Sequence, residues 1–164
     1  QHKPARIIAK MNSLSHPQMI DALYRASQAG VHIDLLVRGI CLLIPGQPRK
    51  SENIRVISII DRYLEHSRIF YFENGGDPAW YLSSADWMPR NLERRVELLF
   101  PILDENNKKL LQYFISVYFA DNVKTFEMRT DGSWIRLSPQ PGLFPIRAQE
   151  VFHLFFERQA YRNL

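Results

Sequence analysis

Residues 6–39, RIIAKMNSLSHPQMIDALYRASQAGVHIDLLVRG, decide the fold. The apolar run over residues 6–12 predicts a short buried strand. Pro17 suits the first turn of a helix, and Gly30 is a typical residue just after a helix end. A second apolar run, over residues 31–39, predicts another strand. A strand, a helix and a strand at this spacing indicate a βαβ unit with two parallel strands.

The rest of the chain continues this alternation of strands and helices. Apolar runs of strand length occur at residues 54–60, 68–72, 80–82, 96–102, 123–128 and 134–137. A helix is predicted to open at Asp104 and another to close the chain over residues 146–164. Asp61 is predicted to cap a short helix that ends at Leu64. We therefore expect one α/β domain over residues 1–164, with a mixed β-sheet flanked by helices.

The composition is that of a globular protein, with 46% apolar and 23% charged residues. The 21 Lys and Arg exceed the 17 Asp and Glu by only four, a charge that permits an anionic partner but does not indicate a nucleic-acid binder. Cys41 is the single cysteine, so an internal disulfide is excluded and a reducing compartment such as the cytoplasm is indicated. No apolar run is long enough to span a bilayer. Because the chain begins with Gln, we expect it to be a piece of a longer protein.

Polar side chains stand where predicted strands end, and this is where α/β sheets bind ligands. These residues are Lys10, Asn12, Arg38, Gly39, Ser84 and Asp86. Arg38 directly follows an apolar run, so its charge leaves a buried strand. Because an unpaired buried charge is costly, Arg38 is expected either to pair with a carboxylate or to bind an anion.

His66 lies just before the predicted strand 68–72, where a capping or half-buried histidine is an ordinary finding. However, His66, Arg68, Glu73 and the tetrapeptide at 83–86 are similar to the phospholipase D superfamily pattern His-x-Lys-x4-Asp followed by Gly-Ser-x-Asn. In that pattern the histidine meets a phosphoryl group and the basic residue stabilises its oxygens. The present sequence has Arg for Lys, Glu for Asp, Ser for Gly and Asp for Asn. It shows neither zinc-ligand spacing nor a P-loop, so we expect no metal site in this chain.

Four longer stretches carry a more specific resemblance. They are IIAKMNSL (7–14), ALYRASQAGVHIDLLVRGICLLIPG (22–46), SENIRVISIIDRYLEHSRIFYFENGGDP (51–78) and SADWMPRNLERRVELLFPI (84–102). Together they resemble the C-terminal catalytic domain of bacterial polyphosphate kinase, a phospholipase D-like domain. The resemblance runs almost continuously from Ala5 to Ile102 and more loosely beyond.

The resemblance implies reversible transfer of the terminal phosphoryl group of ATP to polyphosphate, with Mg²⁺ and through a phosphohistidine. In the family, the phosphorylated histidine and the Mg²⁺-binding residues belong to the preceding domain. Arg38 and His66 match nucleotide-phosphate contacts of the family, and His66 is also a candidate for acid–base catalysis. Arg68, Arg90 and Asn91 are secondary phosphate-binding candidates. Arg68 could instead pair with Glu65 or Glu73, and Arg90 could be a solvated helix residue.

The implied partners are ATP or ADP, polyphosphate, and the preceding domains of the same chain. The resemblance further implies a homo-oligomeric parent enzyme and is compatible with its peripheral association with a membrane. We expect the isolated chain to fold but to be inactive in phosphoryl transfer. Two alternatives stay open at this point: a phospholipase D-like phosphodiesterase, and a non-catalytic phosphate-binding or interaction domain.

Overall fold

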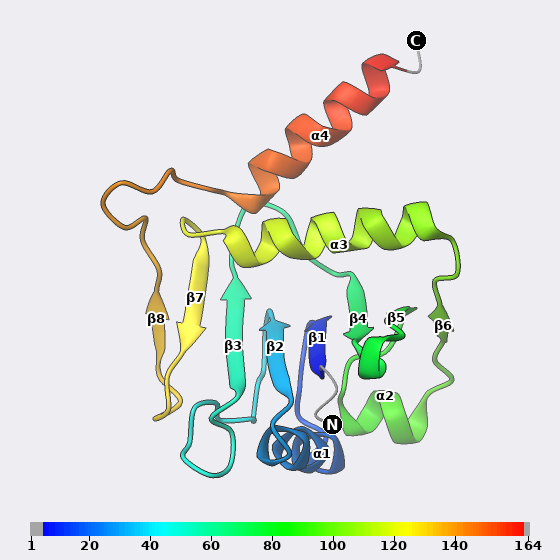
Figure 1. The fold of residues 1–164 in the computed structure, drawn as a ribbon, viewed down its shortest axis with the longest axis vertical. Coiled ribbons are helices and arrows are strands. Elements are labelled where there is room, and N and C mark those ends of the chain that lie inside the picture. The colour runs from blue at the N-terminus through cyan, green and yellow to red at the C-terminus, as the bar shows by residue number, and fades with distance from the viewer. Residues whose placement is uncertain (1–4, 163–164) are drawn as a thin grey trace.

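The computed structural model describes residues 5–162, which build one eight-stranded sheet with four α-helices (Figure 1). Across the sheet the strand order is β6-β5-β4-β1-β2-β3-β7-β8. The strands are β1 (Arg6–Met11), β2 (His32–Val37), β3 (Ile54–Ile59), β4 (Arg68–Phe72), β5 (Ala79–Ser83), β6 (Leu99–Pro101), β7 (Thr125–Met128) and β8 (Trp134–Arg136). The helices are α1 (Pro17–Gln28), α2 (Pro89–Arg94), α3 (Glu105–Ala120) and α4 (Ala148–Arg162), with one 3₁₀ turn at Asn74–Gly76.

The predicted βαβ unit is confirmed. β1 pairs with β2 in parallel, and α1 connects them, beginning at Pro17. Gly30 follows the helix with a φ of 87°, a left-handed conformation that glycine adopts without steric cost. β3 continues the parallel set, whereas β4 runs antiparallel to β1. The sheet is therefore mixed, as the sequence predicts.

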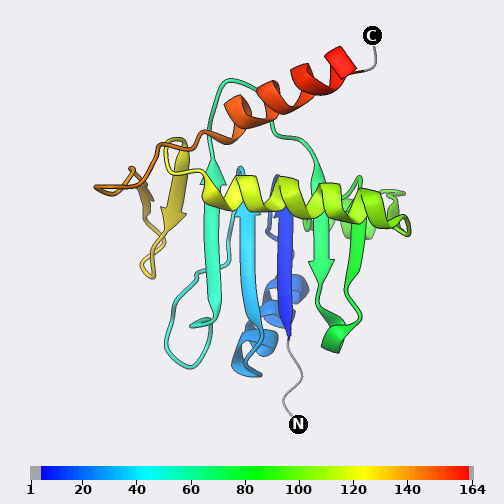
Figure 2. The same ribbon diagram turned by 45° about the horizontal axis from the view of Figure 1, so that its top comes forward.

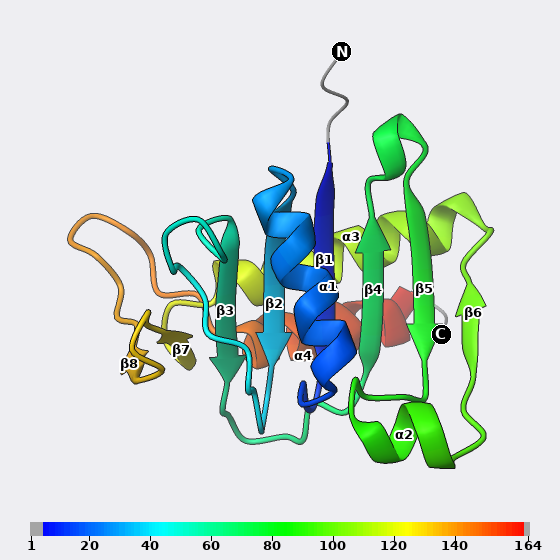
Figure 3. The same ribbon diagram turned by 90° about the horizontal axis from the view of Figure 1, so that it is seen from below.

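The side chains of each central strand alternate between two apolar cores. On β1, Ala9 and Met11 join the core beneath α1, while Ile8 joins the core beneath α3. Figure 2 shows α3 lying across one face of the sheet, and Figure 3 shows α1 on the opposite face. Because both faces are covered, the central strands are apolar on both sides. Lys10, on the α3 face, is a charged residue among these apolar ones and is almost completely buried.

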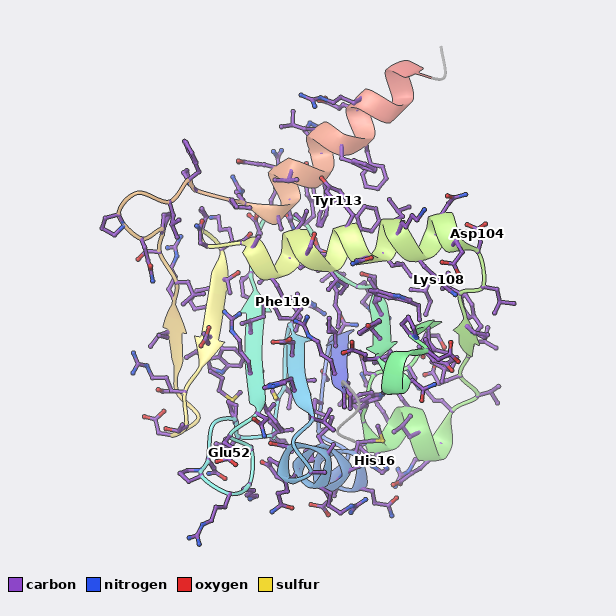
Figure 4. All side chains as sticks on the ribbon, in the orientation of Figure 1. His16, Glu52, Asp104, Lys108, Tyr113 and Phe119 are labelled. Atoms are coloured by element: carbon purple, nitrogen blue, oxygen red, sulfur yellow. The ribbon has the colours of Figure 1, made fainter. Side chains whose placement is uncertain are left out.

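Helices α3 and α4 pack on each other through aromatic side chains. Asp104 caps α3, as predicted, by accepting a hydrogen bond from the backbone N–H of Asn107. Tyr113 lies between the two helices, with its ring centroid 5.2 Å from that of Phe155 (Figure 4). Beyond this contact α4 extends away from the sheet (Figure 1). Within residues 5–162, no helix is long and apolar enough to cross a membrane.

Four differences from the sequence-based elements need correction. No helix forms between Asp61 and Leu64: the Asp61 carboxylate accepts two hydrogen bonds from Arg147 and one from the adjacent N–H of Arg62, and it caps no helix. The strand predicted over residues 96–102 is shorter and begins at Leu99, and the short helix α2 before it was not predicted. The closing helix begins at Ala148, and the last two residues of its predicted range lie outside the described part of the chain.

Candidate phosphate-binding site

The candidate site lies at the edge of the sheet where the parallel strands end. Asn12 follows β1 and Arg38 follows β2 directly. Because β4 runs antiparallel to β1, its first residue, Arg68, lies at the same edge. β5 runs antiparallel to β4, so the residues after it, including Asp86, return there as well. The topology thus gathers polar residues from four chain segments.

Arg38 is half-buried, and among the described residues its side chain makes one hydrogen bond, from Nε to Oδ1 of Asn12 at 3.1 Å. Within residues 5–162 no carboxylate lies within ion-pairing distance of Arg38, so the ion-pair alternative does not hold there. Both Nη nitrogens also lack an acceptor in that part of the chain. A hollow of about 250 Å³ opens beside Arg38 and is lined also by Ser58 and Trp134. The guanidinium is therefore fixed at one end and open to an anion at the other.

Asp86 is the central acceptor of the site and is buried. It accepts from the backbone N–H of Asn12 at 2.7 Å and from Nδ2 of Asn12 at 3.2 Å. It also accepts from Nε of Arg68 at 3.1 Å and from Nη2 at 3.0 Å. Burial by itself raises the pKa of Asp86, but the hydrogen bonds from Arg68 and Asn12 outweigh it and hold the pKa below its usual range.

Arg68 connects Asp86 to His66. Its Nη1 lies 3.1 Å from Nδ1 of His66 and donates to the His66 carbonyl oxygen at 3.0 Å. A guanidinium has donors only, so Nδ1 accepts and the proton of the neutral ring is on Nε2. The two alternatives for Arg68, pairing with Glu65 or with Glu73, are wrong, since its ion pair is with Asp86. One hydrogen-bonded network therefore runs through Arg38, Asn12, Asp86, Arg68 and His66. The exposed His66 ring is its outer end.

Lys10 does not reach this open edge, although it stands near the end of β1. Its Nζ donates to the carbonyl and hydroxyl oxygens of Ser67 and lies 3.7 Å from Glu65. It also stacks on the ring of Tyr118, 5.0 Å from the centroid. Burial lowers the pKa of Lys10 to about 8, and Glu65 offsets only part of that shift. Lys10 therefore supports the site from beneath.

The two remaining secondary candidates lie on α2. Arg90 is exposed, whereas Asn91 is buried and donates from Nδ2 to Glu97. The Asn91 Oδ1 atom has no partner among the described residues. In that part of the chain, no group of three His, Cys, Asp or Glu side chains could hold a metal ion.

Sequence reasoning did not identify Asn12 as the bridge of the site. It also missed Tyr118 and Gln149, which donate to the Glu65 carboxylate, and Arg147, which binds Asp61. Asn12 was noted as a strand-end residue, and Asp86 by its place in the superfamily pattern. No local signal marks Tyr118, Arg147 or Gln149, because each contacts residues far away in the sequence.

Comparison with known proteins shows the family to which the chain belongs. The model of the family "Polyphosphate kinase C-terminal domain 2" matches residues 1–149. The chain belongs to this polyphosphate kinase family. It is 53% identical over 153 residues to a polyphosphate kinase from Rhodopirellula baltica, an alignment that covers 93% of this chain and 18% of that protein. The chain thus spans about a fifth of the length of the curated polyphosphate kinases it matches.

Solved structures show the same fold. The crystal structure of polyphosphate kinase from Porphyromonas gingivalis matches with a TM-score of 0.90 and 41% identity, over 96% of this chain and 24% of that one. Nuc from Salmonella typhimurium, a phospholipase D family member, matches with a TM-score of 0.55 and 12% identity, over 77% of this chain and 84% of that one. The second likeness concerns the fold alone. The predicted phospholipase D-like fold is thereby confirmed for this polyphosphate kinase domain.

Proposed function

We propose that this chain is a catalytic-domain segment of a polyphosphate kinase and that it holds the phosphate groups of ATP during reversible phosphoryl transfer to polyphosphate. The observation that carries the proposal is the hydrogen-bonded network that joins Arg38 to His66 at the strand-end edge. These two residues match phosphate contacts of the family. The network links both of them at the edge where the parallel strands end, and this link supports the proposal.

Arg38 serves as an anion clamp. Its Nε is held by Asn12, so the planar fork keeps one orientation, while both Nη groups find no acceptor among the described residues and can donate to phosphate oxygens. A guanidinium stays charged across the physiological pH range, which suits the binding of a triphosphate. Phosphoryl transfer depends mainly on positioning and charge stabilisation, and Arg38 supplies both.

His66 donates a hydrogen bond to a phosphate oxygen from Nε2. Acid catalysis by the ring would require a second proton on Nδ1, where Arg68 already donates. The contact from Arg68 therefore favours phosphate binding by His66 over proton transfer. Such a preorganised donor stabilises the charge that develops in the transition state.

The secondary candidates receive different roles in this proposal. Arg68 acts through His66, since its Nε, Nη1 and Nη2 atoms all hold partners within the protein. Arg90 is exposed and remains a candidate contact for an extended polyphosphate chain. Asn91 remains the weakest candidate for phosphate binding because it is buried and holds Glu97.

The preceding domain supplies the other parts of the reaction in this proposal. It carries the phosphohistidine and binds Mg²⁺, as the resemblance to the family implies. ADP is the product when polyphosphate is made from ATP, and it is the phosphoryl acceptor in the reverse reaction. We place the whole enzyme in the cytoplasm of a bacterium, as a homo-oligomer.

The test uses a full-length kinase that contains this chain. Arg38→Ala and His66→Ala should each lower ATP-driven polyphosphate formation by about 100-fold, the usual effect of removing one charge-stabilising donor. Arg25→Ala is the matched control, because it removes an exposed arginine from α1, outside the network. Circular dichroism should show that every variant folds. Unchanged kinetics of His66→Ala would remove this residue from the mechanism.

The isolated chain provides a second test. It should bind polyphosphate weakly, with an affinity that decreases from low to high salt concentration, and should transfer no phosphoryl group. Hydrolysis of a simple phosphodiester by the isolated chain would favour the phosphodiesterase alternative. Binding that does not respond to salt would contradict a phosphate clamp.

A further inference from the structure

The segment that carries His66, residues 60–67, has no regular secondary structure of its own. It connects β3 to β4 and crosses beside the carboxyl ends of β2 and β1 (Figure 3). The backbone N–H of Ile60 donates to the carbonyl of Lys124, and beyond that point the segment is held by side chains of other elements. Residues 61, 63 and 65 are all held by other elements, and His66 follows the last of them.

The start of α4 holds the first two of these points. Arg147, just before the helix, donates to both carboxylate oxygens of Asp61, at 2.9 and 2.7 Å. The Asp61 side chain is only 1% exposed. Gln149, the second residue of α4, brackets the backbone of Tyr63: its Oε1 accepts from the Tyr63 N–H and its Nε2 donates to the Tyr63 carbonyl, both at 2.8 Å. The Gln149 side chain thus pairs with both backbone polar groups of Tyr63, as a neighbouring strand would.

The third point is Glu65, directly before His66. Its carboxylate accepts from the Tyr118 hydroxyl at 2.6 Å and from Nε2 of Gln149 at 3.1 Å. Lys10 supplies the counter-charge at 3.7 Å. Burial, followed by the contact with the Glu65 carboxylate, raises the pKa of the Tyr118 hydroxyl, so the hydroxyl stays a donor.

The start of α4 is itself fixed to the end of α3. The carboxylate of Asp121, the residue after α3, accepts from the backbone N–H of Ala148 at 2.8 Å, and this contact is buried. Asn122 accepts from the backbone N–H of Ile146 at 2.8 Å. The start of α4, which holds segment 60–67, is therefore itself tied to the end of α3 by hydrogen bonds.

From these contacts we infer that Gln149 and Tyr118 are positioning residues for His66, acting through Tyr63 and Glu65. The inference rests on the proposed phosphate contact of His66. Gln149 touches no open surface of the site, and its side-chain oxygen and nitrogen are both used on segment 60–67. Its loss should displace the imidazole, and a displacement of about 1 Å can cost roughly 100-fold in rate.

The experiment compares Gln149→Leu with Glu157→Gln in a full-length kinase that contains this chain. Leucine keeps much of the volume but removes all three hydrogen bonds to segment 60–67. We expect kcat to fall at least tenfold and amide hydrogen exchange to rise in residues 60–67, with the exchange of β1 and β2 unchanged. Glu157 lies on the exposed part of α4, so its substitution should change neither quantity.

A double mutant separates positioning from general damage. If Gln149 acts through His66, then Gln149→Leu should cause no further loss in a His66→Ala background. A further loss equal to that in the wild type would overturn the inference. Should Gln149→Leu fail to fold, Tyr118→Phe removes only one hydroxyl from Glu65, and the same comparison applies with a smaller effect.

The two proposals fail in different ways. Unchanged activity of His66→Ala refutes the proposed function. If His66→Ala is inactive but Gln149→Leu keeps the wild-type kcat while residues 60–67 exchange faster, the proposed function stands and the positioning role is refuted.

Discussion

The Asp86→Ala substitution should be among the most destabilising single changes at the site. It removes an acceptor of four hydrogen bonds and leaves Arg68, whose side chain is 12% exposed, without its counter-charge. Breaking a buried ion pair costs about 3–5 kcal/mol. Arg68 keeps some contact with water, so we take the low end of this range and expect a loss of about 3 kcal/mol in the free energy of unfolding.

Urea unfolding of this chain at pH 7 measures that loss. The midpoint should fall while the dependence on urea stays the same, because the surface exposed on unfolding hardly changes. Asp86→Asn is the matched variant: it keeps the shape and one acceptor but loses the charge, so its cost should be smaller. A cost below about 1 kcal/mol for Asp86→Ala would refute the reasoning, since it would equal an ordinary exposed pair.

Acid provides an independent check of the same contact. The pKa of Asp86 is lower in the folded chain than its unfolded value of about 3.9. Its stabilisation is therefore complete above that unfolded value and is lost as the pH falls through the lower folded pKa. The difference between the wild type and Asp86→Ala should shrink as the pH falls below about 4. A difference that stayed constant down to pH 2 would contradict a charge-based role.

Two further predictions concern neighbours of the network. Burial lowers the pKa of Lys10 to about 8, so between this value and the unfolded pKa of about 10.4 the unfolded chain binds more protons than the folded one. The free energy of unfolding of the wild type, relative to that of Lys10→Met, should therefore rise by about 2 kcal/mol from pH 7.5 to 9.5, at about 1.4 kcal/mol per pH unit. Urea unfolding measures this difference, and a difference that does not change with pH would contradict the prediction. Burial also raises the pKa of Cys41 to about 11, but this contribution is the same in the wild type and in Lys10→Met and drops out of the difference in stability. For Gly39→Ala, a new Cβ would lie 3.0 Å from the backbone oxygen of Asn12, which already accepts from the Gly39 N–H at 2.8 Å. We expect a loss of about 1–3 kcal/mol, measured by thermal or urea unfolding, and a loss below about 0.3 kcal/mol would show that the chain yields there without strain.

Local sequence signals predicted much of the fold because the interactions they report are local. The strand over residues 68–72 has the predicted limits, and Asp104 caps α3 as expected. The helix predicted after Asp61 failed for the opposite reason. The Asp61 carboxylate accepts hydrogen bonds from Arg147, 86 residues away, and no local sequence pattern can report such a contact.

The amino-acid sequence by itself determined the βαβ unit, the mixed sheet and the nomination of Arg38 and His66. Apolar periodicity, turn residues and family resemblance are properties of short stretches, and each can be interpreted without knowing the fold. Only the tertiary structure decided how the two residues are joined. Asn12 lies 26 residues from Arg38 and 74 from Asp86, and these partners meet because the sheet brings several chain segments to one edge. The same holds for the support of His66 by α4, which depends on the packing of a helix that begins more than eighty residues later in the chain.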